Sequence, residues 1–227
     1  MKVFVVPVGA SRYQLYVELP RDAVVIDADG ASTGWFARKV QQFKQTLAEA
    51  EEERLRRERG EPTVARGIGR KIMSKIAEAV AEQRLLWSLR HQTRVDLLHP
   101  DDMAAPDALA FVKGEFSRDT ARHRRWMLID GLVTAITGPL FFFVPGPNVV
   151  SWYFTFRTVG HFLSWRGALR GLNDITWTPE ASVPLSGVRA ALALGQAERC
   201  ARLDAIASEL GLAHLTGFVE RLREQAK

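Results

Sequence analysis

The chain has 227 residues, of which 47% are hydrophobic and 25% charged, so it is long and apolar enough to fold around a substantial core. The formal net charge of +5 is compatible with anionic lipid, nucleic acid or an ordinary soluble surface, and it selects none of them. The single cysteine, Cys200, excludes an internal disulfide, and no short zinc-type Cys/His spacing or cofactor motif occurs. We therefore expect a reducing compartment, no metal and no cofactor.

The N-terminal region, residues 1–30, contains two β-rich runs. Val3–Val8 and Tyr13–Leu19 are separated by a Gly-Ala-Ser turn, which predicts a β-hairpin. Pro7 has no backbone N–H to donate, so its strand is expected at the edge of a sheet.

Residues 31–125 are predicted to form a helical, partly charged cytoplasmic region. Apolar residues at helical spacing predict a helix from Trp35 to about Arg59 and a second helix after Pro62. A short strand is expected at Thr93–Leu98, and a further helix begins near Ala108.

Two apolar stretches dominate residues 126–165. Trp126–Val144 contains only one formally charged residue, Asp130, and Val149–Trp165 contains only Arg157. As helices they would reach roughly 28 Å and 25 Å, which is close to the thickness of a bilayer core, about 30 Å. The sequence between them cannot continue a helix and predicts a reversal of the chain at Pro145, Gly146, Pro147 and Asn148.

This region is therefore predicted to be a hydrophobic helical hairpin inserted in a membrane, and the alternative is a buried helical pair in a soluble protein. Arginines precede and follow the hairpin, whereas its turn carries no charge. By the positive-inside rule, both termini are expected on the cytoplasmic side of a bacterial inner membrane. If the hairpin is instead a soluble core, the protein is cytoplasmic.

Charged residues inside such a hairpin need partners. With the turn centred on Gly146 and Pro147, Asp130 and His161 lie at a similar level, and Arg157 shares a helix face with His161. We expect Asp130, Arg157 and His161 to form an intramembrane charge cluster. Two interpretations stay open: a salt bridge that fixes the register of the hairpin, or a site that responds to protons or other ions, because histidine titrates near neutrality.

Three segments resemble a known family. MKVFVVPVG at the N-terminus, VPGPN at Val144–Asn148 and WYFTFRTVGHFLSWRGA at Trp152–Ala168 are similar to the mitochondrial K⁺/H⁺ exchange-related proteins, and the chain is identified as a bacterial member of that family. The resemblance is most specific over residues 120–172, where Gly167 also matches. It implies a membrane-associated protein linked to potassium and proton exchange, with a lipid bilayer, K⁺ and H⁺ as partners.

A complete carrier normally encloses its ion path with several helices, often as internal repeats, and this sequence offers one hairpin and no repeat. We therefore expect an accessory factor, or one that acts as a homo-oligomer or in a larger membrane complex. No nucleophile or base stands at a useful spacing, so no enzyme activity and no catalytic residue are predicted.

Residues 166–227 are expected to contain a small helical subdomain. Leu203–Leu222 imitates a helix-turn-helix, with Gly211 suited to a left-handed helix cap. After Thr216, Arg221 and Arg223 are balanced by Glu220 and Glu224, which disfavours nucleic acid as a partner. A DNA-binding regulator and a soluble interaction scaffold are the alternative functions. The fold class predicted for the whole chain is mainly α with a small N-terminal β element, that is, α+β.

Overall fold

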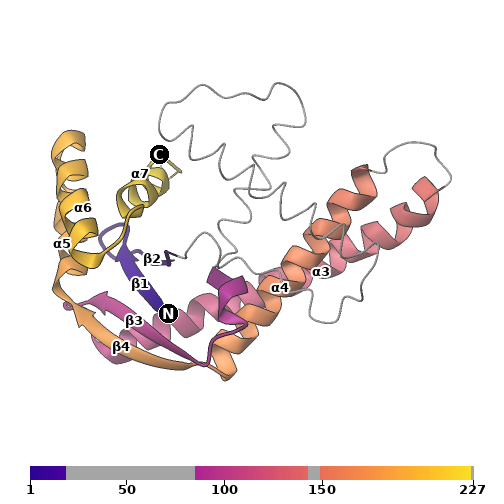
Figure 1. Ribbon diagram of the computed structural model, residues 1–227, viewed down its shortest axis with the longest axis horizontal. Helices are drawn as coiled ribbons and strands as arrows, with labels where there is room; N and C mark the ends of the chain where they lie inside the picture. Colours follow the sequence, from indigo (N-terminus) through magenta and orange to yellow (C-terminus); the bar gives the residue numbers. More distant parts are fainter. Residues whose placement is uncertain (19–84, 143–148, 226–227) are drawn as a thin grey trace. The chain divides into compact units, whose positions relative to one another are not determined.

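The computed structural model describes residues 1–18, 85–142 and 149–225 (Figure 1). Met1–Pro20 and Leu85–Lys227 belong to one compact unit. The predicted helices at Trp35–Arg59 and after Pro62 lie outside the described residues, as does the predicted turn at residues 145–148. The described part is mainly helical with one small sheet, which confirms the predicted α+β class.

The sheet has four strands in the order β2-β1-β3-β4. Strand β1 (Lys2–Pro7) pairs antiparallel with β2 (Tyr13–Tyr16), as the hairpin prediction requires. Strand β3 (Arg94–Pro100) confirms the strand expected at Thr93–Leu98 and runs parallel to β1. The fourth strand, β4 (Thr176–Ser182), runs parallel to β3. The sheet thus joins N-terminal residues to segments from the middle and the end of the chain.

The expected edge position of the Pro7 strand is wrong, because β1 lies between β2 and β3. The structure accommodates Pro7 because β1 pairs with β2 and with β3 over different residues. Strand β3 pairs only with Lys2–Phe4, so the parallel ladder has ended before Pro7. Pro7 itself faces Tyr13 at the last position of the hairpin. A missing N–H therefore interrupts no pairing with β3.

The connection between β3 and β4 consists of two long helices, because parallel strands need a crossover. Helix α3 spans Ala105–Phe142 and α4 spans Val149–Asn173. They run antiparallel, since His123 meets His161 and Phe116 meets Gly171. Both helices extend well beyond the predicted apolar stretches, and α3 confirms the helix expected near Ala108. Neither they nor any other helix in the described residues combines the length and apolar character that crossing a membrane requires.

Three helices, α5 (Val183–Leu192), α6 (Gln196–Leu210) and α7 (Leu215–Gln225), pack on one face of the sheet. Phe4 and Val6 of β1 share a buried cluster with them, while the alternate residues Val3 and Val5 point to the opposite face. On α3, the ring of Phe116 contacts Trp177 of β4. Helices therefore supply apolar partners to the sheet from the central and C-terminal parts of the chain.

Helix α6 ends at Gly211, whose φ of 70° confirms the predicted left-handed cap. The N–H of Leu212 donates to the carbonyl of Ala207, and that of Gly211 donates to Ser208, so two terminal carbonyls are satisfied. The carboxylate of Glu18 accepts the N–H of Ala213 in the following turn. This contact ties the start of α7 to the N-terminal hairpin.

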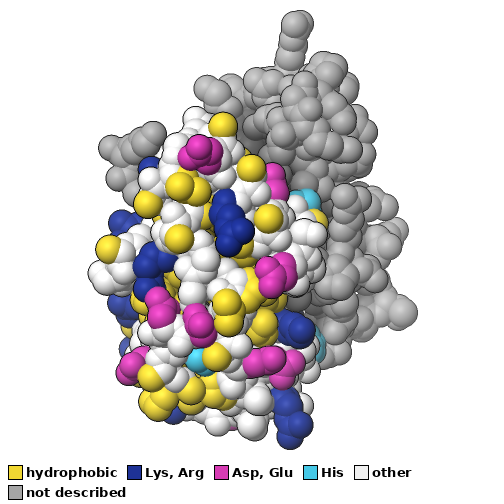
Figure 2. All heavy atoms as spheres, turned by 90° about the vertical axis from the view of Figure 1, so that its left-hand side faces the viewer, with side chains coloured by type: hydrophobic (Ala, Val, Ile, Leu, Met, Phe, Trp, Pro, Cys, Tyr) yellow, Lys and Arg dark blue, Asp and Glu magenta, His cyan; other side chains and the backbone are white. Residues whose placement is uncertain are grey.

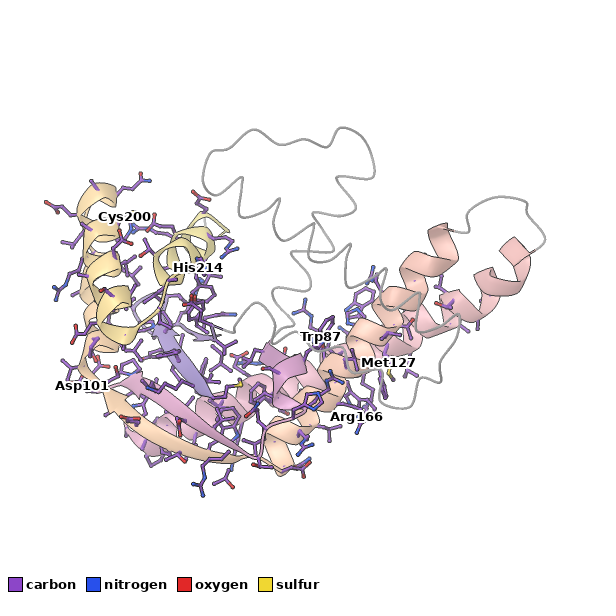
Figure 3. The ribbon with its side chains drawn as sticks, in the orientation of Figure 1. Trp87, Asp101, Met127, Arg166, Cys200 and His214 are labelled. Carbon is purple, nitrogen blue, oxygen red and sulfur yellow. The ribbon has the colours of Figure 1, made fainter. Side chains whose placement is uncertain are left out.

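Glycines allow a close approach between α4 and the short helical segment at residues 85–89. A Cβ added to Gly167 would stand 1.7 Å from the carbonyl oxygen of Leu86, and one added to Gly171 would stand 2.8 Å from the ring of Phe116. The next residue, Ala168, is fully buried. Trp87 lies against α4 as well (Figure 3), where its indole N–H donates to the hydroxyl of Ser164. The small residues at this part of α4 are thus required by packing.

We predict that Gly167→Ala lowers the free energy of unfolding by about 1–3 kcal/mol, because the new methyl group overlaps backbone that cannot rotate away. Gly114→Ala is the matched control, since Gly114 lies in α3 with open space around it and should gain up to about 1 kcal/mol from helix propensity. Chemical denaturation of both variants measures the difference. Equal stability of the two variants would contradict the close approach.

Candidate functional site

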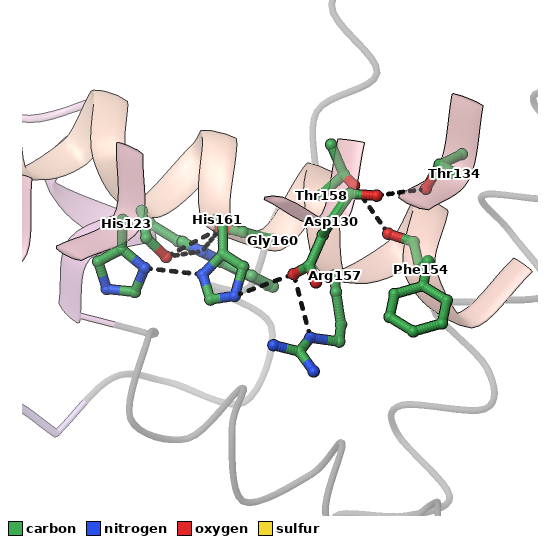
Figure 4. Close-up of polar contacts among 10 residues, drawn as sticks. His123, Asp130, Thr134, Phe154, Arg157, Thr158, Gly160 and His161 are labelled. Carbon is green, nitrogen blue, oxygen red and sulfur yellow. Dashed lines mark hydrogen bonds and ion pairs between the residues drawn. The ribbon is translucent and has the colours of Figure 1, made fainter. Parts of the chain in front are cut away.

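A group of buried and partly buried ionisable side chains lies between α3 and α4 (Figure 4). Asp130 is 2% exposed and His123 is 6% exposed. These two residues are seven positions apart, or about two turns, so both face α4. From α4, Arg157 and His161 are four positions apart and point back toward them. The seven-residue spacing on α3 and the four-residue spacing on α4 thus place four polar side chains in one interface.

The structure brings the three predicted residues together around the carboxylate of Asp130. Its Oδ2 atom lies 3.2 Å from Nε of Arg157 and 3.5 Å from Nε2 of His161. These are ion-pair distances, although Oδ2 makes no contact with full hydrogen-bond geometry within the described residues. Oδ2 is therefore held by charge rather than by directed hydrogen bonds. Its position inside a membrane stays a prediction.

Neighbouring hydroxyl groups do not serve this carboxylate. Thr134 donates to the backbone carbonyl of Asp130, and Thr158 donates to that of Phe154, each four residues earlier in its own helix. Arg157 is partly exposed and lies with its guanidinium 5.6 Å from the ring centre of Trp126. Arg157 thus bridges the buried carboxylate and the surface, and its cation contacts an aromatic face on the way.

His123 is the member that sequence reasoning missed. It precedes the apolar stretch and stands among arginines, so the search for charges within that stretch does not include it. In the structure its Nδ1 lies 2.9 Å from Nδ1 of His161. The helical spacing from Asp130 was the signal that could have identified it. The four residues His123, Asp130, Arg157 and His161 are called the interhelical cluster below.

Burial changes the protonation of the cluster. Desolvation, followed by the charges of His161 and Arg122, lowers the pKa of His123 to about 4. The pKa of His161 is also lowered, chiefly by burial, although the Asp130 carboxylate acts in the opposite direction. One turn before His123, burial and Glu115 raise the pKa of Asp119 to about 6. Both imidazoles are therefore neutral at pH 7.

His99 and the charged residues of the C-terminal helices make contacts outside the interhelical cluster. His99 is buried with its Nδ1 beside the carbonyl of Pro100, and no set of three metal-ligating side chains gathers in the described residues. In the helix-turn-helix imitation, Glu220 binds Arg199 and Arg223 donates to the carbonyl of Leu192. On the face that includes α5 and α6, acidic and basic side chains are mixed and no patch of one sign is visible (Figure 2). These contacts give the C-terminal helices a packing role.

We predict that His123 makes stability dependent on pH. A histidine whose folded pKa lies below its unfolded value of about 6.5 stabilises the fold above that value, and this contribution is lost as pH falls toward 4. Between pH 7 and 5 the loss is on the order of 2 kcal/mol. The measurement is the free energy of unfolding of the wild type minus that of His123→Gln. Taking the difference removes Asp119, which acts with the opposite sign. A difference that does not change with pH would contradict the prediction.

Comparison with known proteins adds one match. No curated protein and no solved structure matches the chain. Residues 2–175, more than half of the sequence, match the family described as mitochondrial K⁺-H⁺ exchange-related. The match includes β1 to β3 and both long helices with the interhelical cluster, and it ends before β4 and the C-terminal helices. The chain therefore belongs to the mitochondrial K⁺-H⁺ exchange-related family.

Proposed function

We propose that this protein is a membrane-associated accessory factor in potassium/proton exchange, which acts as a homo-oligomer or within a larger membrane complex. The family relation supports the link to cation homeostasis. The observation that carries the proposal is that the α3/α4 pair buries Asp130 and His123 between its helices while many large apolar side chains of the pair are exposed. The proposed location is the cytoplasmic face of a bacterial inner membrane.

The second half of α3 exposes a stripe of aliphatic side chains. Leu128 is 64% exposed, Leu132 63% and Ile136 61%, and Ile129 lies beside them. They recur at intervals of four residues, so they share one side of the helix, while Asp130 points to the other. On α4, Val159 and Phe162 are also exposed. A contiguous apolar surface of this kind indicates a contact with lipid or with another protein.

Exposed arginines border this apolar stripe. Arg122, Arg124 and Arg125 lie immediately before it on α3, and Arg166 extends over the ring of Phe162 on α4. In Figure 3, Arg166 and Met127 mark this part of the helix pair. Guanidinium groups beside an apolar surface match the phosphates and acyl chains of an anionic bilayer, and each basic residue near such a surface contributes about 1 kcal/mol. Charge complementarity thus favours an anionic lipid surface.

An accessory role fits the number of helices better than a carrier role. Ion paths through transporters are enclosed by several helices, whereas the described residues provide one antiparallel pair. Within the interhelical cluster, Asp130 already pairs with Arg157, and His123 already contacts His161. We therefore assign ion passage to an oligomer or to a partner protein.

A soluble interaction scaffold is the second candidate. The C-terminal helices lie beyond the family match and form their own core on the sheet, in which Leu185, Leu203 and Leu215 are fully buried. A helical layer added to the sheet outside the family match suits a role in binding other proteins. In that case the apolar stripe would bind protein rather than lipid.

Lipid binding is tested by flotation of the full chain with vesicles of phosphatidylglycerol and phosphatidylcholine. We expect flotation with the anionic vesicles and a loss of at least about tenfold in Leu128→Gln/Leu132→Gln, because two exposed apolar side chains no longer enter the acyl region. Val183→Gln is the matched control, since Val183 is 71% exposed on α5, outside the stripe. Wild-type protein that stays with the soluble fraction, or equal loss in both variants, would favour the scaffold.

The link to exchange is tested by K⁺-dependent proton flux in membrane vesicles from the native host. Deletion of the gene should lower the flux, and the wild-type chain should restore it. Arg157→Ala should restore less, because it leaves the buried Asp130 carboxylate without its nearest cation. Flux that is the same with and without the chain would refute a role in exchange, whatever the outcome of flotation.

A further inference from the structure

In the contact between His123 and His161, either ring can be the hydrogen-bond donor, depending on which nitrogen carries the proton. Their Nδ1 atoms are 2.9 Å apart and the ring centres are 5.2 Å apart, so the two imidazoles share a hydrogen bond. An imidazole nitrogen can donate only when protonated and accept only when not. One of the two Nδ1 atoms must therefore carry a proton while the other carries none.

Asp130 determines which one is protonated. Nε2 of His161 lies 3.5 Å from Oδ2, and the negative charge of the carboxylate favours the tautomer that carries a proton on this nitrogen, although the contact lacks full hydrogen-bond geometry. In a neutral ring the Nδ1 of His161 is then the acceptor, and the proton between the two rings belongs to His123. The neutral cluster therefore has His123 protonated at Nδ1 and His161 protonated at Nε2. An isolated histidine usually favours Nε2, so the arrangement of His123 is distinctive.

We propose that His123 and His161 form a binding site for one exchangeable proton within the α3/α4 interface. An incoming proton binds Nε2 of His123, and the shared proton moves from Nδ1 of His123 to Nδ1 of His161. The products are a neutral His123 protonated at Nε2 and a His161 imidazolium beside the Asp130 carboxylate. One proton enters and the positive charge appears one ring further along, so atoms and charge balance.

The charges around the pair limit the site to one proton. From α3, the Asp130 carboxylate favours the His161 imidazolium, whereas Arg122 opposes it, and Asp119 lies one turn before His123. From α4, Arg157 also opposes it. A second proton would place N–H groups on both Nδ1 atoms, and two donors 2.9 Å apart repel each other. Uptake of two protons must therefore separate the rings, and with them this part of the two helices.

The inference goes beyond the proposed function, because the site is defined by contacts inside the helix pair and needs neither lipid nor K⁺. It also differs from a purely structural ion pair between Asp130 and Arg157, which would hold the helices in register without binding an exchangeable proton.

The test is ¹⁵N NMR of the imidazole groups in the full chain, recorded without lipid from pH 8 to pH 4. At pH 8 we expect His123 to be protonated at Nδ1 and His161 at Nε2, with a coupling between the two Nδ1 atoms across the hydrogen bond. On acidification, the first proton should change the signals of both residues together with one shared midpoint. A second step should abolish the coupling.

Asp130→Asn gives a second, independent measurement. It keeps the side-chain shape but removes the charge that favours the His161 imidazolium, so the first midpoint should move to lower pH by about one unit or more. Asp107→Asn, an exposed carboxylate on the same helix, is the control and should leave the midpoint unchanged.

Two results would overturn the proposal: protonation of both rings at Nε2 at pH 8, or two independent midpoints at ordinary histidine values. Both are read from the wild-type protein, so the test holds even if Asp130→Asn fails to fold. Failure here would leave vesicle flotation and ion flux unaffected, and failure of those assays would leave the proton site unaffected.

Discussion

The burial of one carboxylate organises the long helices of this protein. Asp130 is almost inaccessible to water, and an isolated charge in that position would cost several kcal/mol. Arg157 and His161 on the facing helix offset this cost, which fixes how far one helix can slide along the other. A shift of one turn, about 5.4 Å, would part the carboxylate from both partners. The electrostatic demand of a single side chain therefore restricts the register of the pair around Asp130.

At its base, the same pair is fixed by shape rather than by charge. Gly167 lets α4 touch the backbone at Leu86, and Gly171 makes room for the ring of Phe116, which in turn contacts the sheet through Trp177. Packing thus defines one end of the pair, and the interhelical cluster defines a point about two turns earlier in α4. Because the exposed side of α3 contributes to neither, its aliphatic residues are free to serve an external partner. The fold separates the residues that position the helices from those that face outward.

The sequence was sufficient for features that depend on local spacing. The β1/β2 hairpin, the strand at β3, the left-handed Gly211 and the proximity of Asp130, Arg157 and His161 all follow from intervals of two to four residues or from one antiparallel reversal. Features that depend on distant pairing were missed. Strand β4 contains Pro179 and few apolar residues, and it is a strand because it adds to the outer side of β3, where a proline is tolerated. The contact of His123 with His161 joins residues 38 positions apart, and only its spacing from Asp130 on the same helix is visible in the sequence.

The order of the strands also constrains how the chain can be assembled. Lys2 pairs with Asp96, and Arg94 pairs with Thr176, so both parallel ladders join residues that are far apart in sequence. Such ladders form slowly, because a long loop must close before any contact rewards it. The N-terminal hairpin emerges from the ribosome long before β3, and β3 long before β4. Until synthesis passes residue 182, β3 lacks one of its two neighbouring strands, so the sheet can be completed only after both long helices have been translated.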